Sequence, residues 1–544
     1  MADENCCSSA SRKILYRQQG YWGDATLADY WRMAVLCSPE KQAVIDLQGT
    51  SYTYAELDEA AGRVAAYLTG IGIAPGDIVS VQLPGWAEFT VIYVACLKAG
   101  AVINPIFSIF RNNELIYILN KCESKVLFIP SQFKGYVYSA MRGVLSEKVP
   151  SLAHIVSVER EHKVADGTTL DEVLQSHAPL PAQVARRADD LAAILFTSGT
   201  EGFPKGVMFT HNNIIASEKA FAARINFTCY DVFLMPSPVG HATGFHHGVT
   251  MTFMFGAKSV LQDIFKPEVS LKLIERERCT LGMGATPFAF DMLQVLKSQQ
   301  YDISSMRFFL CGGAPIPRQM MKESLKSGLK VTGVYGSTES PPHVATSLAD
   351  SPQKITSTDG VAVAGVEVKV VDEFGRVARE GEEASRGPNV FVGYLKEPEL
   401  TAKALDKEGW FYSGDYCTID DEGYIRITGR KKDIIIRGGE NISSCEVEDV
   451  LLQHPNIHEA GVVAMPDPRL GEKACAYVAL NDAGKGLTLE ELRIFFAGMD
   501  ISKHKCPERI EIVDKLPRTE SGKIQKFLLK QDLKNKLGGI TAAP

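Results

Sequence analysis

The sequence predicts an α/β protein with a large N-terminal domain, residues 1–430, followed by a small α+β domain, residues 431–544. Helix and strand patterns alternate over residues 53–129 and again over residues 231–335, which is typical of largely parallel sheets covered by helices. From about residue 355 to 430, apolar and polar residues alternate instead, which is typical of half-buried strands. We therefore expect two α/β subdomains and one β-rich subdomain within the N-terminal domain.

Composition and charge predict a globular protein for which nucleic acid is not a main partner. Of the 544 residues, 45% are hydrophobic and 23% are charged, and the length corresponds to roughly three or four domain-sized units. The formal net charge of −7 argues against nucleic acid as a main partner, because phosphate contacts require a basic surface. A local basic site for a small anion is compatible with this charge.

The cysteines and the N-terminal sequence favour a cytoplasmic location. The 12 cysteines are dispersed without a C-x-x-C pair, and the N-terminus shows no secretory signal pattern, so we expect reduced thiols. No apolar run approaches the roughly 20 residues of a membrane-spanning helix, so we expect no transmembrane segment. Peripheral membrane contact stays open, and the sequence does not specify an oligomeric state.

The first α/β subdomain begins with a helix that carries its own start signal. Thr53 and Glu56 form a capping-box pattern, and apolar residues follow at helical spacing. Strands are expected at residues 77–83, 101–106 and 125–129, and helices at residues 87–98 and 114–121. Residues 141–190 are polar and weakly periodic, so we expect surface connections there.

A Gly-rich loop at residues 197–206 follows an apolar strand pattern at residues 191–196. Its hydroxyls, glycines and Lys205 suit phosphate oxygens, because amides and hydroxyls donate, glycines permit close approach and the ammonium neutralises charge. It is not the common P-loop, since Pro204 replaces the second glycine and Gly206 replaces the magnesium-binding hydroxyl. By itself, the pattern also fits an ordinary Gly-rich hairpin.

Two strand ends of the second α/β subdomain are expected to face one crevice. Strands are predicted at residues 231–235, 259–261, 281–285, 308–310 and 331–334, and helices at residues 211–221, 269–277 and 288–298. Ligands of open α/β sheets bind beyond the carboxyl ends of strands, where residues 311–315 and 335–339 lie. The sequence therefore predicts a ligand site at this edge of the sheet.

Three histidines, His241, His246 and His247, follow the predicted strand at residues 231–235. The adjacent pair would point apart on a helix or strand, and no Cys or carboxylate lies at ligand spacing nearby, so a metal site is set aside. His241 lies just past a strand end among small residues, which favours a substrate-facing position over a structural one. The other two are expected to pack in the interior or lie on the surface.

A charged cluster at residues 430–433 marks the boundary between the two predicted domains. Beyond it, helix-capping patterns begin at Ser443 and Thr488, and strands are expected at residues 460–464 and 474–480. The alternation of caps and apolar runs predicts a small α+β unit.

Together, five motifs resemble those of the adenylate-forming superfamily, which includes acyl-CoA synthetases, peptide-synthetase adenylation domains and luciferases. They lie in the family's order at residues 197–206, 335–339, 412–415, 429–440 and 517–523. The resemblance covers about residues 50–530. Within the superfamily, the chain is most similar to bacterial short- and medium-chain fatty acyl-CoA synthetases of anaerobic fatty-acid degradation, through residues 85–97, 240–250 and 307–313.

The resemblance implies a ligase that converts a fatty acid, ATP and CoA into acyl-CoA, AMP and diphosphate through an acyl-adenylate, with Mg²⁺ as cofactor. The chemistry is sensible, because a carboxylate has no good leaving group whereas its adenylate can release AMP. The implied ATP-binding residues are Thr197, Ser198, Gly199, Thr200, Lys205, Gly313, Ala314, Pro315, Tyr335, Gly336, Thr338, Asp415, Arg430 and Lys523. The implied catalytic residues are Lys523, Thr338, Glu339 and His241, with Glu339 also the magnesium ligand.

The resemblance also implies a mobile C-terminal domain that turns about a hinge at Lys432. Gly438 and Gly439 would border the path of CoA, and the acyl pocket would be lined by His241, Gly282, Gly284 and Ala285. One departure concerns Glu201, which stands where relatives carry Thr or Ser; a carboxylate there would repel bound phosphates unless it points outward or contacts a cation.

Two alternatives stay open at this point. A sister enzyme could use an alicyclic or aromatic carboxylate, or pass the acyl group to a carrier protein. A catalytically silent nucleotide-binding protein is a second alternative, although Lys523, Glu339 and Asp415 argue against it. Taken singly, Lys523 also fits a solvated surface position, Asp415 a turn, and Glu339 a position next to a helix N-cap.

Overall fold

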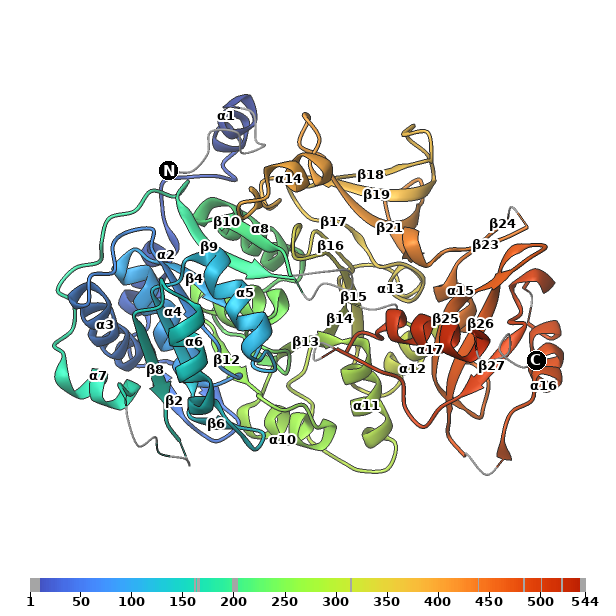
Figure 1. The fold of residues 1–544 in the computed structure, drawn as a ribbon, viewed down its shortest axis with the longest axis horizontal. Coiled ribbons are helices and arrows are strands. Elements are labelled where there is room, and N and C mark those ends of the chain that lie inside the picture. The colour runs from blue at the N-terminus through green and yellow to red at the C-terminus, as the bar shows by residue number, and fades with distance from the viewer. Residues whose placement is uncertain are drawn as a thin grey trace.

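The computed structural model of the chain describes residues 10–160, 163, 167–197, 204–313, 316–438, 440–482, 485–499, 501–519 and 522–538. A large N-terminal domain contains two α/β subdomains and a β-rich sheet, and a small α+β domain lies beside it (Figure 1). The predicted fold class is therefore confirmed.

The first α/β subdomain has a seven-stranded sheet of order β20-β10-β9-β4-β3-β5-β8. Its strands are β3 (Ile78–Val81), β4 (Val102–Pro105), β5 (Val126–Pro130), β8 (His154–Val158), β9 (Leu191–Phe196), β10 (Gly206–Thr210) and β20 (Gly393–Tyr394). Its helices are α3 (Tyr54–Gly70), α4 (Ala87–Ala99), α5 (Asn112–Cys122), α6 (Arg142–Lys148) and α7 (Leu170–Ser176). Thr53 and Glu56 form the predicted capping box at the start of α3.

Residues 141–190 contain surface connections, as expected, and also regular elements that were not predicted. They contribute α6, α7 and the edge strand β8, which pairs in parallel with β5. Only the last three residues of β8 are fully buried, so the polar flanks conceal a short strand in the sequence.

The second α/β subdomain has a nine-stranded sheet of order β17-β16-β15-β14-β13-β11-β12-β1-β2. Its strands are β1 (Gln42–Asp46), β2 (Ser51–Thr53), β11 (Val232–Met235), β12 (Lys258–Leu261), β13 (Leu281–Ala285), β14 (Phe308–Gly312), β15 (Val331–Tyr335), β16 (Val344–Ala345) and β17 (Val361–Ala362). Helices α2 (Leu27–Cys37), α8 (His211–Arg224), α10 (Pro267–Glu277), α11 (Thr286–Leu296), α12 (Arg318–Ser324) and α13 (Pro352–Ser357) belong to this part of the chain. Strands β13, β14 and β15 are parallel neighbours, so their carboxyl ends meet at one edge.

The β-rich subdomain is a four-stranded antiparallel sheet, β18 (Glu367–Val371), β19 (Glu380–Arg386), β21 (Phe411–Ile419) and β22 (Ile425–Arg430). One helix, α14 (Pro398–Ala404), precedes β21. The register of the last two strands sets Asp415 directly opposite Arg430. Cross-strand neighbours of opposite charge attract one another, and this pair faces the site described below.

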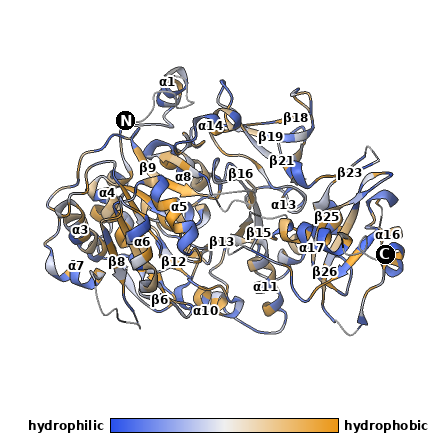
Figure 2. Cartoon of the chain, viewed as in Figure 1, coloured by the Kyte–Doolittle hydropathy of each residue, from blue (hydrophilic) through white to orange (hydrophobic). Residues whose placement is uncertain are grey.

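The C-terminal domain is a mixed sheet of β23 (Ile435–Arg437), β24 (Glu440–Ile442), β25 (Ile457–Asp467), β26 (Gly471–Leu480) and β27 (Arg509–Ile512). Its helices are α15 (Ser444–Leu451), α16 (Leu489–Ala497) and α17 (Lys526–Gly538). Ser443 caps α15 and Thr488 caps α16, as their sequence patterns predict. Figure 2 shows hydrophobic residues gathered within this domain and, separately, within the larger one.

The chain passes between the two domains over a few residues. β22 ends at Arg430, a short 3₁₀ turn spans Lys431–Asp433, and β23 begins at Ile435. We propose that the domain boundary and a hinge at Lys432 lie here, because large backbone changes are absorbed at the ends of elements. In the described part of the chain, no helix combines the length and apolar character needed to span a membrane.

Arg426 on β22 connects the two domains. Its guanidinium lies 3.2 Å from the carboxylate of Asp359 and 3.3 Å from that of Asp449 on α15, and it donates to the Ile316 carbonyl at 3.0 Å. Burial raises the pKa of Asp449 from its usual 3.8 to about 6, although Arg426 opposes this rise. Glu448 raises the pKa further, while Arg318 lowers it.

The substitution Asp449→Asn is expected to change how stability depends on pH. The folded-state pKa of about 6 exceeds the unfolded value of 3.8, so between these values the folded protein holds a proton that the unfolded chain lacks. Stability should therefore fall as pH rises from about 4 to about 6, and the variant should lose this part of the fall. Urea unfolding midpoints across this range would measure it, with the exposed Asp514→Asn as control. Equal pH slopes in wild type and Asp449→Asn would contradict the prediction.

Candidate active site

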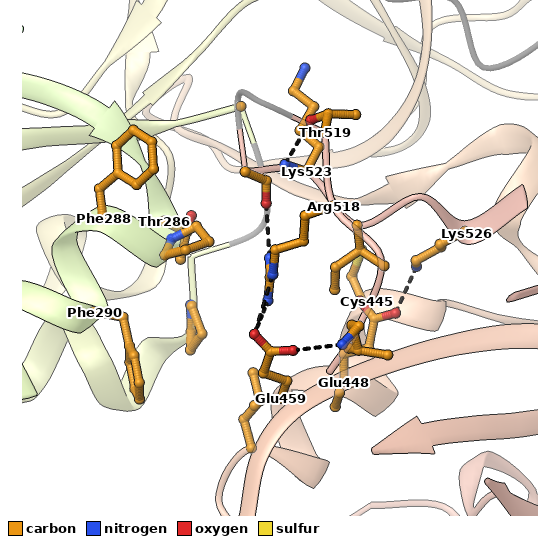
Figure 3. Close-up of a pocket in the computed structure, with 18 of the residues that line it drawn as sticks. Thr286, Phe288, Phe290, Cys445, Glu448, Glu459, Arg518, Thr519, Lys523 and Lys526 are labelled. Carbon is orange, nitrogen blue, oxygen red and sulfur yellow. Dashed lines mark hydrogen bonds and ion pairs between the residues drawn. The ribbon is translucent and has the colours of Figure 1, made fainter. Parts of the chain in front are cut away.

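A cavity of about 1850 Å³ lies between the two domains and is lined by residues of both. It brings together most of the described residues that sequence motifs single out, namely Thr197, Lys205, His241, Gly313, Tyr335, Gly336, Thr338, Glu339, Asp415, Arg430, Lys432 and Lys523. Figure 3 shows Phe288 and Phe290 on the side of the larger domain, with Lys523 and Arg518 reaching in from the C-terminal domain.

Several predicted residues lie outside the described part of the chain. They are Ser198, Gly199, Thr200, Glu201, Ala314, Pro315 and Gly439. The residues that flank the Gly-rich loop are described, and they close a hairpin between β9 and β10. The Thr197 amide donates to the Lys205 carbonyl at 3.0 Å, and the Lys205 amide donates to Thr197 Oγ1 at 3.3 Å.

Asp415 lies at the centre of a buried polar group. Its Oδ2 accepts a hydrogen bond from Tyr335 Oη at 2.9 Å, and its Oδ1 lies 3.0 Å from Nε of Arg430. Burial raises the pKa of Asp415, while the guanidinium of Arg430 opposes the rise. Tyr335 Oη also contacts Glu383 Oε2 at 3.2 Å, a partner that no sequence motif indicates. The carboxylate of Asp415 is thus oriented toward the cavity edge where β15 ends.

Glu339 follows β15 and is held by a tyrosine from another sheet. Its Oε1 accepts from Tyr394 Oη at 2.8 Å, and Nζ of Lys205 lies 4.9 Å from the centre of the same tyrosine ring. Lys205, Glu339 and Tyr394 therefore meet, although they are far apart in sequence. Tyr394 was missed at the sequence level, because a lone Gly-Tyr pair at a strand carries no motif.

Lys523 reaches into the cavity over the backbone of Gly313. A Cβ at Gly313 would lie 3.4 Å from Cε of Lys523, which places the lysine side chain directly against this residue, and the φ of 77° at Gly313 favours glycine. Burial lowers the pKa of Lys523, and Arg430 lowers it further, whereas the carboxylates of Asp415 and Glu339 raise it. The charge of the lysine therefore interacts with the carboxylates of both acidic residues of the site.

His241 lines the same cavity and is a neutral imidazole. Burial lowers its pKa to about 3, and the positive charge of Lys523 contributes to this lowering. Its Nδ1 accepts from the Thr243 amide at 3.2 Å. A neutral ring suits a wall beside an acyl chain better than a general acid would, because the charged form is not populated near pH 7.

The other two histidines are packed in the interior, within the expectation drawn from sequence. Both lie in the π-helical segment η2 (Thr243–Met251) with no exposed surface. Nδ1 of His247 lies 2.7 Å from Oε2 of Glu218 on α8, a carboxylate that sequence spacing did not reveal.

The three small residues predicted for the acyl pocket are not among the residues that line the cavity. A Cβ at Gly282 would lie 2.9 Å from the Phe309 ring, and a Cβ at Gly284 would lie 2.7 Å from Cδ2 of Phe288. Ala285 ends β13, and the cavity is lined here by the next residues, Thr286, Pro287 and Phe288. The aromatic ring of Phe288 stacks on Phe265, with ring centres 4.1 Å apart. Gly284 therefore makes room for the aromatic wall at Phe288, whereas Gly282 makes room for the buried ring of Phe309.

Gly438 lies away from the cavity in this arrangement of the domains. It is exposed in the hairpin of β23 and β24, has a φ of 62°, and donates its amide to the Leu470 carbonyl at 2.7 Å. Lys432 is exposed at the cavity edge. In this arrangement of the domains, the segment that carries Lys523 faces the cavity and Gly438 does not.

The chain belongs to the AMP-binding enzyme family. The family model for the AMP-binding enzyme matches residues 31–395, and that for the AMP-binding enzyme C-terminal domain matches residues 446–523. The resemblance to the adenylate-forming superfamily, drawn from the motifs, is confirmed by these matches.

Individual relatives span nearly the whole chain. The chain is 54% identical over 529 residues to the medium-chain fatty-acid–CoA ligase of Escherichia coli (strain K12), which covers 97% of this chain and 94% of that protein. It is 33% identical over 520 residues to the putative acyl-CoA synthetase YngI of Bacillus subtilis (strain 168), covering 91% and 94% respectively. Among solved structures, ATP-bound MatB from Rhodopseudomonas palustris has a TM-score of 0.86 at 30% identity, covering 94% of this chain and 99% of that chain.

Proposed function

We propose that this chain is an AMP-forming fatty acyl-CoA ligase that acts on short- or medium-chain acids. The observation that carries the proposal is the meeting of Lys523 with Glu339 and Asp415 in one cavity between the domains. The names of the E. coli and B. subtilis relatives support the reaction class, and the first supports the chain length. The described cysteines are all free thiols, which fits the proposed cytoplasmic location.

In the first half-reaction, a carboxylate oxygen of the fatty acid attacks the α-phosphorus of ATP, and diphosphate leaves with the electron pair of the broken P–O bond. Negative charge grows on the α-phosphoryl oxygens, so Lys523 and Thr338 are proposed to stabilise it. Asp415 accepts hydrogen bonds from the ribose hydroxyls, and Thr197 and Lys205 hold the departing phosphates. The protein thus contributes positioning and preorganised charge rather than covalent chemistry.

Glu339 fits a magnesium ion, because Mg²⁺ is usually bound by one or two carboxylates together with phosphate oxygens and water. Its carboxylate lines the cavity beside Thr338 and is oriented by Tyr394. Within the described ranges, no group of three or more His, Cys, Asp or Glu side chains could hold a metal alone, so substrate oxygens would complete the coordination. When bound, the ion supplies positive charge at the phosphates.

In the second half-reaction, the CoA thiolate attacks the acyl carbonyl, and AMP leaves with the electron pair of the carbon–oxygen bond. For this step we propose that the C-terminal domain turns about Lys432, so that Gly438 and Gly439 replace Lys523 at the cavity. Glycines suit the path of a thiol arm, because a side chain would narrow it. The left-handed backbone of Gly438 also favours glycine there.

A panel of acids tests the proposal directly. The purified protein should release AMP in a CoA-dependent manner with straight-chain acids from butanoate to decanoate, and less with benzoate or cyclohexanecarboxylate. Activity confined to the cyclic acids would favour a sister ligase. Bound ATP without diphosphate release for any acid would favour a silent nucleotide-binding protein.

The substitution Gly284→Ala is expected to shift the preferred chain length downward. The new methyl group would lie 2.7 Å from Cδ2 of Phe288, which lines the cavity, so we expect the ring to shift into the cavity. Because one methylene in an apolar pocket changes specificity by about 10-fold or more, we expect kcat/KM for octanoate to fall about 10-fold relative to butanoate. Gly70→Ala at the end of α3, where no atom lies within 4 Å of the new Cβ, is the control. An unchanged ratio in Gly284→Ala would contradict the aromatic wall.

A further inference from the structure

Arg518 joins the sheet of the C-terminal domain to the segment that carries Lys523 (Figure 3). Its Nε and Nη2 donate to Oε1 of Glu459 on β25, at 3.3 and 3.0 Å. Its Nη1 donates to the carbonyl oxygen of Gly522 at 2.8 Å. Because Gly522 directly precedes Lys523, this hydrogen bond from the guanidinium fixes the backbone at the start of Lys523.

Both carboxylate oxygens of Glu459 accept hydrogen bonds. Its Oε1 accepts from Arg518, and its Oε2 accepts from the Leu516 amide at 3.0 Å. The Arg518 and Glu459 side chains are only 21% and 16% exposed, so solvent screens them less than an open surface pair. Charge-assisted bonds of a planar guanidinium are both stronger and more directional than neutral ones. The pair therefore fixes an orientation, which an isolated surface lysine could not do.

Arg518 and Glu459, here called the clamp, connect a paired strand to a segment that contains a glycine with left-handed backbone. β25 pairs with β26 along its whole length, and Leu516 is buried in the domain core. Gly522 has a φ of 83°, in the left-handed region that glycine adopts without the strain that a Cβ would cause. The Thr519 amide and hydroxyl bond to the Lys523 backbone at 2.8 and 3.1 Å, but these bonds lie within the segment and do not tie it to the sheet.

We propose that Arg518 and Glu459 are positioning residues that set the reach of Lys523 for the adenylation half-reaction. Neither residue is proposed to touch the substrate; each acts through the backbone on either side of the lysine. The proposal rests on the proposed function, because it assigns Lys523 to adenylation. A misplacement of about 1 Å at a reacting group can cost on the order of 100-fold in rate, so loss of the clamp should be visible.

The experiment compares the two half-reactions in Arg518→Ala. We expect acyl-adenylate formation from octanoate and ATP to lose about 10- to 100-fold in kcat with little change in the KM for ATP. Thioester formation from preformed octanoyl-AMP and CoA should stay near the wild-type rate. In a Lys523→Ala background, Arg518→Ala should cause no further loss, because it acts only through that lysine.

Two further variants separate positioning from folding. Arg509→Ala removes a comparable pair, Arg509 with Glu511 at 2.6 Å on β27 of the same domain, and should leave both half-reactions unchanged. Glu459→Gln keeps the side-chain shape but loses the charge, and it should lower adenylation alone, by less than Arg518→Ala. Equal losses in both half-reactions, equal effects of Arg518→Ala and Arg509→Ala, or additive losses with Lys523→Ala would overturn the proposal.

The wild-type enzyme separates this proposal from the one on which it rests. If wild type forms acyl-adenylate and Arg518→Ala does so equally well, the positioning role fails while the proposed function stands. If wild type forms no acyl-adenylate with any acid, the proposed function fails, and the positioning of Lys523 fails with it.

Discussion

The substitution Lys523→Ala is expected to abolish most acyl-adenylate formation while sparing thioester formation. Lys523 is the cationic group that the C-terminal domain places in the cavity beside Gly313, where it interacts electrostatically with Asp415 and Glu339. Removing a preorganised donor at developing charge typically costs about 3–4 kcal/mol, which corresponds to a rate loss of roughly 10²- to 10³-fold. Single-turnover formation of octanoyl-AMP from octanoate and ATP would measure this loss.

The second half-reaction provides the internal comparison for Lys523→Ala. Octanoyl-AMP made chemically and mixed with CoA should yield octanoyl-CoA at close to the wild-type rate. The exposed Lys515, which lines the same cavity in the same domain, gives a matched control as Lys515→Ala. If both half-reactions of Lys523→Ala fell by the same factor, the lysine would not act in adenylation specifically.

The order of helices and strands was predictable where the signals are local. The Thr53–Glu56 capping box and the alternation that produces β3, α4 and β4 depend on residues close in sequence, and they agree with the structure. The edge strand β8 was missed because its buried half is only three residues long within a polar stretch. The pairing of β1 with β12 joins residues more than 200 positions apart, which no local pattern can indicate.

The candidate site likewise contains residues that were predicted from sequence and residues that were not. The motif residues Asp415 and Arg430 were identified from sequence, and they are also cross-strand neighbours of one antiparallel pair. The groups that orient the motif residues were not identified: Tyr394 at Glu339, and Glu459 at Arg518, come from strands that only the tertiary fold brings near. The aromatic wall shows the same limit. Gly284 was identified from sequence as a small residue, but its proposed role depends on the ring of Phe288, which was not identified.

The substitution Asp415→Ala is expected to weaken ATP binding by about 100-fold. The carboxylate is proposed to accept hydrogen bonds from the ribose hydroxyls, and hydrogen bonds to charged groups each contribute about 1.5–3 kcal/mol. Its removal also leaves Tyr335 Oη and the Arg430 guanidinium without their nearest acceptor. Titration calorimetry with ATP would measure the change in dissociation constant. Asp420→Ala, which removes an acidic partner of Lys354 following β21, is the control.

Deoxynucleotides distinguish loss of the ribose contact in Asp415→Ala from a general disturbance of the site. Wild type should bind ATP more tightly than 2′-deoxy-ATP, because the missing hydroxyl removes one charge-assisted hydrogen bond to the Asp415 carboxylate. In Asp415→Ala the two nucleotides should bind equally, since the acceptor for that hydroxyl is gone. If the variant kept the wild-type preference for ATP while losing affinity, the carboxylate would act on the shape of the site through Tyr335 and Arg430 rather than on the ribose itself.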